Sequence, residues 1–297
     1  MCVVTGHNAA LERVRFHPHD HFLLCTSAGD RSVRIWDIRI NSNSQRCLMK
    51  LDISSESRSV EWHPSSSRGS QYLAVSESEG SIHIYDMRYL NKGTASKPVR
   101  LFHLNPHVLH EAHFSPSGTH LVAATKCSED GMGKLRVFPW DTADCKDVDS
   151  HSTFVGHTGS IYTLKFSPDG NRLATGGYDA LVGLWDVRSM VCTSTISRKK
   201  FIRSVSFTYD SKFVACCGEE DGIDIASTDT GSVFGTVVMP QKNNQPRFNT
   251  VGGGADEIAF HPNAYVLACA RGDASSSSSS GPNFSQVTVA NLKITAQ

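Results

Sequence analysis

The fold is decided by GHTGSIYTLKFSPDGNRLATGGYDALVGLWD, which covers residues 156–186. This stretch contains three short runs of alternating apolar and polar residues, near 164–166, 173–175 and 181–186, with turn-forming residues between them. Alternation with a period of two is typical of β-strands, because neighbouring side chains point to opposite faces. The stretch therefore predicts three short strands, and a fourth apolar run follows Trp185-Asp186.

The same pattern recurs along the whole chain. Residues 6–37 repeat it almost completely, from Gly6-His7 to Trp36-Asp37, and four weaker copies follow the same order of runs. The position equivalent to the tryptophan falls at residues 36, 85, 138, 185, 226 and 290. In the third copy Trp140 stands two residues late. The phase of the strand assigns the position to Phe138, so the loss of Trp140 is expected to cost much less stability than the loss of Trp185.

Four-stranded repeats marked by Gly-His and Trp-Asp resemble WD40 repeats, which implies an all-β fold, the β-propeller. Six repeats are recognisable, near residues 6–53, 54–104, 105–155, 156–197, 198–239 and 254–297, and we expect them to form one domain over 1–297. Residues 273–283 contain six consecutive serines and are predicted to be a flexible loop.

Within this class, the second half of the chain resembles the third subunit of the THO complex. The resemblance is carried by residues 179–187, by 203–207 and by Ile-Asp-Ile-Ala at 223–226, where most WD40 repeats have Trp-Asp. Propellers of that family have seven blades, so the resemblance implies that one N-terminal blade of roughly 40 residues is missing. The alternative is that residues 1–4 supply a closing strand for a ring of six.

The resemblance implies a non-enzymatic scaffold in the nucleus that docks on large helical subunits of the transcription–export assembly. It implies no cofactor and no small-molecule substrate. The formal net charge is zero, with 29 basic and 29 acidic residues, so contact with messenger RNA is expected to be indirect. No run of about 20 apolar residues is present to span a membrane.

Two sets of charged residues are candidate partner contacts. Asp37 with Arg39 and Asp186 with Arg188 follow the Trp-Asp mark in a spacing that resembles the DWD box. That box implies an alternative function, a substrate receptor for a cullin-4-type ubiquitin ligase. The densest basic stretch contains Arg198, Lys199 and Lys200. We interpret it either as a contact for RNA or an acidic partner segment, or as a solvated loop.

Two constellations resemble catalytic sites. They consist of His7, Thr26, Asp30 and Trp36 in the first repeat and of His157, Thr175, Asp179 and Trp185 in the fourth. Histidine, hydroxyl and carboxylate together suggest a hydrolase triad, but a triad needs an exposed nucleophile and an oxyanion site. A threonine inside a strand offers neither. We therefore predict two structural tetrads, each a buried hydrogen-bond network.

Histidines and cysteines offer no clear metal or disulfide pattern. Two histidine clusters could offer zinc ligands but are predicted to be ordinary surface residues: His17, His19 and His21, and His107, His110 and His113. The nine cysteines include no C-x-x-C pair and are predicted to be small buried apolar residues.

Overall fold

The computed structural model describes residues 4–40, 47–64, 72–88, 97–104, 107–127, 130–140, 152–220, 222–238, 255–271 and 286–292. Every regular element in these ranges is a β-strand, which confirms the all-β prediction. No helix in the described ranges is long and apolar enough to cross a membrane. The chain separates into an N-terminal unit, Met1–Phe154, and a C-terminal unit, Val155–Gln297. The prediction of a single domain over 1–297 stays a prediction.

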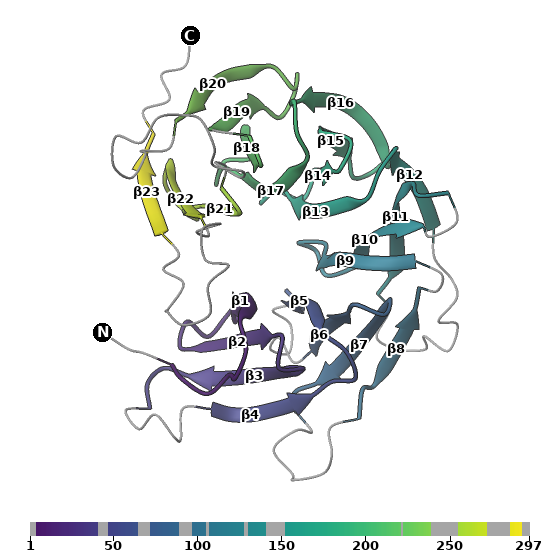
Figure 1. Cartoon of the computed structure of the whole chain (residues 1–297), viewed down its shortest axis with the longest axis vertical. Helices are drawn as coiled ribbons and strands as arrows, with labels where there is room; N and C mark the ends of the chain where they lie inside the picture. Colours follow the sequence, from purple (N-terminus) through teal and green to yellow (C-terminus); the bar gives the residue numbers. More distant parts are fainter. Residues whose placement is uncertain are drawn as a thin grey trace, which may run out of the picture. The chain divides into compact units, whose positions relative to one another are not determined.

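The N-terminal unit holds three sheets, which we call blades 1 to 3, and the last strand of the third sheet continues past the unit boundary at residue 154 (Figure 1). Blade 1 consists of β1 (Leu11–Phe16), β2 (Leu23–Ala28), β3 (Ser32–Asp37) and β4 (Cys47–Asp52). Blade 2 consists of β5 (Ser57–Trp62), β6 (Tyr72–Glu77), β7 (Ser81–Asp86) and β8 (Arg100–His103). Blade 3 consists of β9 (His107–Phe114), β10 (His120–Cys127), β11 (Gly133–Pro139) and β12 (Ser152–His157).

The C-terminal unit contains blades 4 to 6. Blade 4 consists of β13 (Ile161–Phe166), β14 (Arg172–Gly177), β15 (Leu181–Asp186) and β16 (Val191–Ser197). Blade 5 consists of β17 (Ile202–Phe207), β18 (Phe213–Gly218), β19 (Ile223–Ser227) and β20 (Val233–Val237). Blade 6 shows β21 (Glu257–Phe260), β22 (Val266–Arg271) and β23 (Gln286–Asn291) within the described residues.

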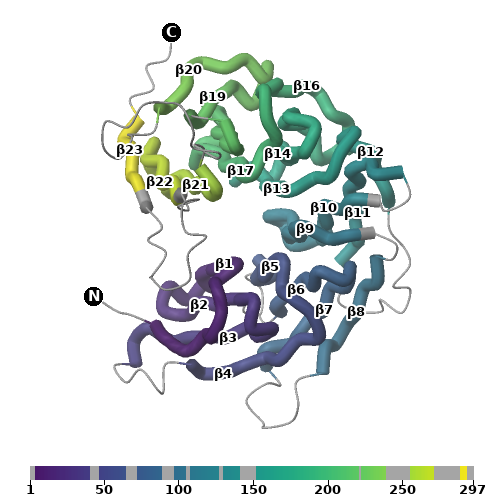
Figure 2. Tube along the Cα trace, viewed as in Figure 1, coloured from purple at the N-terminus to yellow at the C-terminus, as the bar shows by residue number. Residues whose placement is uncertain are grey.

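In every blade the strands pair in chain order, so each blade is a simple meander (Figure 2). Five blades have the four predicted strands, and blade 6 has three among the described residues. Residues 1–3 of the alternative closing strand lie outside the described residues, as does the predicted loop 273–283.

The pairing register confirms which residues are equivalent between blades. Leu173 pairs with Trp185 in blade 4, and Leu121 pairs with Phe138 at the same place in blade 3. Phe138 is buried there, as the strand phase predicts.

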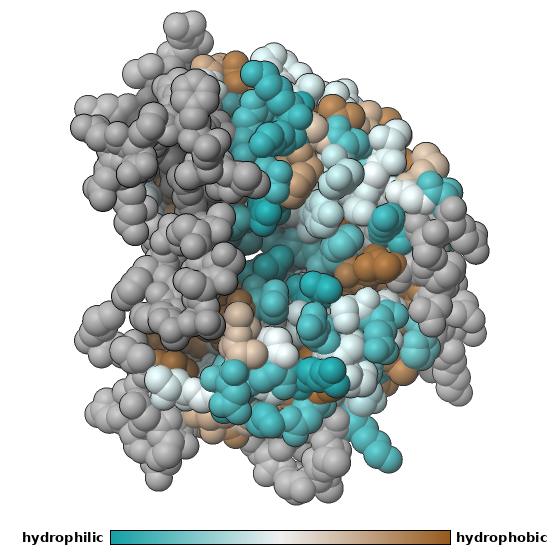
Figure 3. All heavy atoms as spheres, viewed as in Figure 1, coloured by the Kyte–Doolittle hydropathy of each residue, from teal (hydrophilic) through white to brown (hydrophobic). Residues whose placement is uncertain are grey.

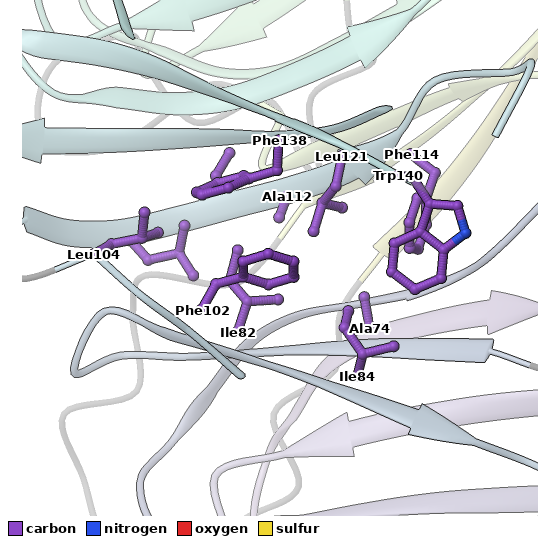
Figure 4. Close-up of a cluster of buried hydrophobic side chains, with 12 residues drawn as sticks. Ala74, Ile82, Ile84, Phe102, Leu104, Ala112, Phe114, Leu121, Phe138 and Trp140 are labelled. Carbon is purple, nitrogen blue, oxygen red and sulfur yellow. The ribbon is translucent and has the colours of Figure 1, made fainter. Parts of the chain in front are cut away.

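Trp140 corrects a second part of the same prediction. Although it follows β11, its side chain is only 9% exposed and belongs to the core between blades 2 and 3 (Figure 4). Its ring contacts the rings of His63, Tyr72 and Phe114, with centroids 5.2, 5.4 and 5.3 Å away. The expectation that the loss of Trp140 costs little stability is therefore wrong, because the burial of its side chain is decided by the neighbouring blade rather than by the repeat pattern.

The hydrophobic core lies between neighbouring blades of each unit. In the C-terminal unit one buried cluster joins Val182 and Ile196 of blade 4 to Ile202 and Phe207 of blade 5. A second cluster joins blade 5 to blade 6 through residues such as Ile223 and Leu267. A single blade could not bury both of its faces, so each one depends on its neighbour for stability.

Tight turns set the spacing of the strands. The turns between the first two strands of blades 3, 4 and 5 each hold a left-handed residue at the same place, Gly118, Gly170 and Ser211, with φ of 71°, 74° and 62°. Ala180, in the turn before β15, is also left-handed, with φ of 63°. A left-handed conformation costs a residue with a Cβ atom about 1–2 kcal/mol.

Candidate functional site

Blade 4 brings the four predicted tetrad residues together. The indole Nε1 of Trp185 donates to Thr175 Oγ1 at 2.9 Å, and the same oxygen lies 2.8 Å from His157 Nε2. On its other side, His157 Nδ1 lies 2.9 Å from Asp179 Oδ1. Asp179 also accepts the backbone N–H of Thr158 at 3.0 Å. The chain of bonds thus runs from β15 through β14 to the segment that precedes β13.

Blade 1 repeats this geometry. Trp36 Nε1 donates to Thr26 Oγ1 at 2.7 Å, His7 Nε2 lies 2.7 Å from that oxygen, and His7 Nδ1 lies 3.0 Å from Asp30 Oδ2. Burial alone would raise the pKa of Asp30, but hydrogen bonds from Ser32, from the backbone of Asn8 and from His7 outweigh it and lower the pKa to about 2. The Asp30 carboxylate is therefore held in its charged form.

The direction of the hydrogen bonds in blade 4 follows from Asp179. A carboxylate only accepts, so His157 carries its proton on Nδ1, and Nε2 then accepts the hydroxyl proton of Thr175. The Thr175 oxygen in turn accepts from the indole. Thr175 is fully buried, so no substrate can reach its hydroxyl. The arrangement acts as a clamp between strands, since a nucleophile has to be exposed to its substrate.

Two glycines make room for the blade 4 network. A Cβ atom on Gly177 would lie 2.5 Å from His157 Nδ1, and one on Gly183 would lie 3.0 Å from Thr175 Oγ1. Sequence reasoning did not single out these residues. The sequence signal for these glycines was their position inside predicted strands, where a glycine often marks a place at which another group packs close to the backbone.

Blade 5 contains a corresponding network that sequence reasoning missed. Arg198 lies 18 residues before Cys216, the same separation as between His157 and Thr175. Its guanidinium donates to the carbonyl oxygens of Cys216 at 2.9 Å and Gly222 at 3.2 Å. It also pairs with Glu220 at 3.5 Å, and Glu220 stands where blade 4 has Asp179. An arginine–glutamate pair thus replaces the histidine–aspartate pair.

This placement corrects the expectation that Arg198 contacts a partner. Its side chain is 2% exposed, so it is part of the interior of blade 5. The two lysines beside it remain at the surface: the Lys199 side chain is 89% exposed, and Lys200 is exposed as well. The common spacing to residues 216 and 220 was the sequence signal that could have identified Arg198.

The basic stretch is largely balanced by carboxylates of the same unit. Lys199 Nζ lies 3.8 Å from Glu220. Arg203 pairs with Glu219 at 3.4 Å and with Asp256 at 3.0 Å. The stretch therefore offers little excess positive charge to a phosphate backbone, which attracts proteins through unpaired basic side chains.

The Asp-x-Arg motifs behave differently in the two units. Arg39 forms a bidentate pair with Asp37, with Nε and Nη2 at 2.9 and 2.6 Å from its two oxygens. Asp186 instead accepts both the backbone N–H and the hydroxyl of Ser189 at 2.8 Å. Arg188 is exposed, and its guanidinium forms no hydrogen bond or ion pair with the residues that the structure describes.

The histidine clusters are less uniform than predicted. His113 is 7% exposed, and it lies 3.3 Å from Glu61 and 3.0 Å from Glu111. Burial, followed by the charges of Arg58 and Lys126, lowers the pKa of His110 to about 4. The expectation of surface residues is thus wrong for His113, because β9 turns it toward the carboxylates of blades 2 and 3. No metal-binding group of His, Cys, Asp and Glu exists in the described ranges.

Cys25, Cys47, Cys192, Cys216 and Cys217 are free thiols. Cys25, Cys216, Cys217 and Cys269 are buried as predicted, whereas Cys192 is exposed on the outer strand β16. Burial raises the pKa of Cys216 to about 11, so this thiol stays protonated and unreactive.

Repeated four-stranded meanders with Trp–Thr–His–Asp networks define a WD40-repeat β-propeller, and this is the fold class of the chain. The family described as "WD domain, G-beta repeat" matches residues 1–37 and 149–186. These two matched stretches are the ones that contain the tetrads of blades 1 and 4.

Comparison with characterised proteins gives several distant relatives. The chain is 26% identical over 257 residues to THO complex subunit 3 of Arabidopsis thaliana, covering 85% of this chain and 74% of that protein. It is 23% identical over 244 residues to eukaryotic translation initiation factor 3 subunit I of Culex quinquefasciatus, covering 80% of this chain and 71% of that protein. It is 27% identical to WD repeat-containing protein AAC3 of Dictyostelium discoideum, but spans only 39% of its length.

Proposed function

We propose that this chain is a non-enzymatic scaffold subunit of a THO-type complex, which couples transcription to messenger-RNA processing and nuclear export. The observation that carries the proposal is the similarity to THO complex subunit 3, which extends over most of both chains. The Ile-Asp-Ile-Ala run at 223–226 adds to it, because this run forms β19 of blade 5, where the Arg198 network replaces the usual tetrad.

In this role the chain resides in the nucleus and binds large helical subunits of the complex. It needs no cofactor, and it contacts messenger RNA through those subunits. The balanced basic stretch supports the indirect contact, since Lys199 and Arg203 already face carboxylates of the same unit. The buried position of Thr175 supports a structural rather than a catalytic role for the tetrads.

The test is affinity purification of the tagged full chain from nuclear extract, followed by mass spectrometry. We expect large helical THO subunits to be recovered, and the recovery to survive ribonuclease treatment because the contact is between proteins. Recovery of a cullin-4 adaptor without THO subunits would contradict the proposal.

A second candidate function, a substrate receptor for a cullin-4-type ligase, is favoured by one observation. Arg188 is exposed and its guanidinium forms no ion pair with a described residue, so it is available to a partner carboxylate in a bidentate pair. Arg39 is a matched control, because Asp37 already occupies it. If the chain is such a receptor, Arg188→Ala should abolish adaptor recovery and Arg39→Ala should not.

A further inference from the structure

Three aromatic rings of the C-terminal unit form a partly exposed surface, which we call the aromatic shelf. It consists of Tyr162 on β13, Tyr178 in the turn after β14, and Phe201 just before β17. The Tyr178 and Phe201 rings stack at 5.7 Å with an angle of 22°, and Tyr162 lies 5.6 Å from Phe201. Tyr178 is 61% exposed. On the face drawn in Figure 3, hydrophobic residues lie in small patches among hydrophilic ones.

The backbone holds the shelf in place before any partner arrives. A Cβ atom on Gly218 would lie 2.0 Å from the carbonyl oxygen of Phe201, so the glycine lets this segment lie directly against β18. Buried Arg198 holds the same segment through its bonds to the carbonyl oxygens of Cys216 in β18 and of Gly222. The backbone N–H of Tyr178 donates to Ser160 at 2.8 Å. A fixed surface loses little entropy on binding, which favours recognition.

The charges around the shelf indicate what it binds. Arg203 covers Phe201 at 5.2 Å and is paired with Glu219 and Asp256, so it contributes little to the attraction of phosphates. Lys200 is exposed on the same segment and forms no ion pair with a described residue. The shelf therefore combines a neutral aromatic platform with one available ammonium group, a combination that suits a peptide better than a nucleic-acid backbone.

We propose that the aromatic shelf binds an extended proline-rich segment of a partner protein, with an acidic residue of that segment facing Lys200. Proline-rich segments are already extended in solution and dock on aromatic side chains with little further loss of entropy. The proposal deepens the scaffold role and rests on it.

The experiment selects binders of the full chain from a random library of displayed peptides about twelve residues long. Enriched peptides are then measured by fluorescence anisotropy against the full chain and its variants. We expect enrichment of sequences that combine prolines with aspartate or glutamate. Tyr178→Ser should weaken their binding about fivefold to tenfold, because one exposed ring contact is lost. Tyr178→Phe keeps the ring and should stay within about twofold.

Tyr209→Ser is the matched control, since Tyr209 is 40% exposed in the turn after β17 and belongs to another ring cluster. It should leave peptide binding unchanged. The proposal is overturned if prolines are not enriched, if Tyr178→Ser binds as well as the unaltered chain, or if a uridine dodecamer competes for the shelf and binds more tightly than the peptides.

The nuclear pull-down separates this outcome from that of the scaffold proposal. If the pull-down recovers THO subunits normally but the peptide selection does not enrich prolines, the shelf proposal alone is refuted. Proline enrichment that depends on Tyr178, without recovered THO subunits, would leave the shelf valid and refute the named complex.

Discussion

Replacing Thr175 by valine tests the hydrogen-bond clamp of blade 4 most directly, because the two side chains have nearly the same shape. The substitution leaves Trp185 Nε1 and His157 Nε2 without their partner at 2.9 and 2.8 Å. Each buried orphan costs about 1–3 kcal/mol. The added methyl group returns about 0.8 kcal/mol through burial. The free energy of unfolding should therefore fall by about 1–5 kcal/mol.

Urea unfolding followed by far-ultraviolet circular dichroism measures this change. In a Trp185→Phe background the indole donor is already absent, so Thr175→Val orphans only His157 and should cost about 1–2 kcal/mol less. Thr195→Val on the exposed face of β16 is the control and should stay within about 0.5 kcal/mol of the unaltered chain. A cost for Thr175→Val below about 0.5 kcal/mol, or full additivity with Trp185→Phe, would refute the clamp.

Four further outcomes are expected. Trp140→Ala should lower the free energy of unfolding by about 3–5 kcal/mol, close to the effect of Trp185→Ala, because both side chains are buried. Trp140→Phe should lower it much less than Trp185→Phe does, because Trp140 Nε1 donates to no described residue. Equal losses for the two phenylalanine variants in urea unfolding would contradict this. The Asp30 pKa of about 2 lies below its unfolded value of 3.8, so this carboxylate stabilises the fold above pH 4. About 1–2 kcal/mol of unfolding free energy should be lost as the pH falls toward 2. Asp30→Asn should remove this pH dependence of stability, and a variant with an unchanged dependence would argue against it. Ala180→Gly should raise the unfolding free energy by up to about 1 kcal/mol because φ is 63° there, while Ala174→Gly in β14 should lower it; a lower melting temperature for Ala180→Gly would disprove the strain. The purified chain should bind single-stranded RNA weakly and lose it steeply with salt, and tight binding at high salt in filter assays would overturn the indirect role.

The repeat pattern was enough to predict the sheets and the equivalence of Phe138 with the tryptophans, because both depend on the period of two within a strand. It was not enough for Trp140 or His113. Their burial is imposed by the adjacent blade, which no local period describes. Prediction was also limited by the residue types expected at the tetrad positions. An arginine and a glutamate stand at the tetrad spacing in blade 5, and they were not recognised because histidine and aspartate were expected there. Gly177 and Gly183, beside His157 and Thr175, were missed because their role depends on a packing distance.

The position of Arg198 has an evolutionary consequence. The chain leaves blade 4 along its outer strand β16 and, one residue after that strand ends, fixes blade 5 from inside. The family-matched stretch 149–186 runs from β12, the last strand of blade 3, to β15, the third strand of blade 4, so this unit of sequence is offset from the sheets by one strand. A duplication that copied one sequence repeat would carry the last strand of one blade together with the first three strands of the next. Such a copy could complete its sheets only with strands of the neighbouring repeats. Every added copy would therefore share sheets with its neighbours.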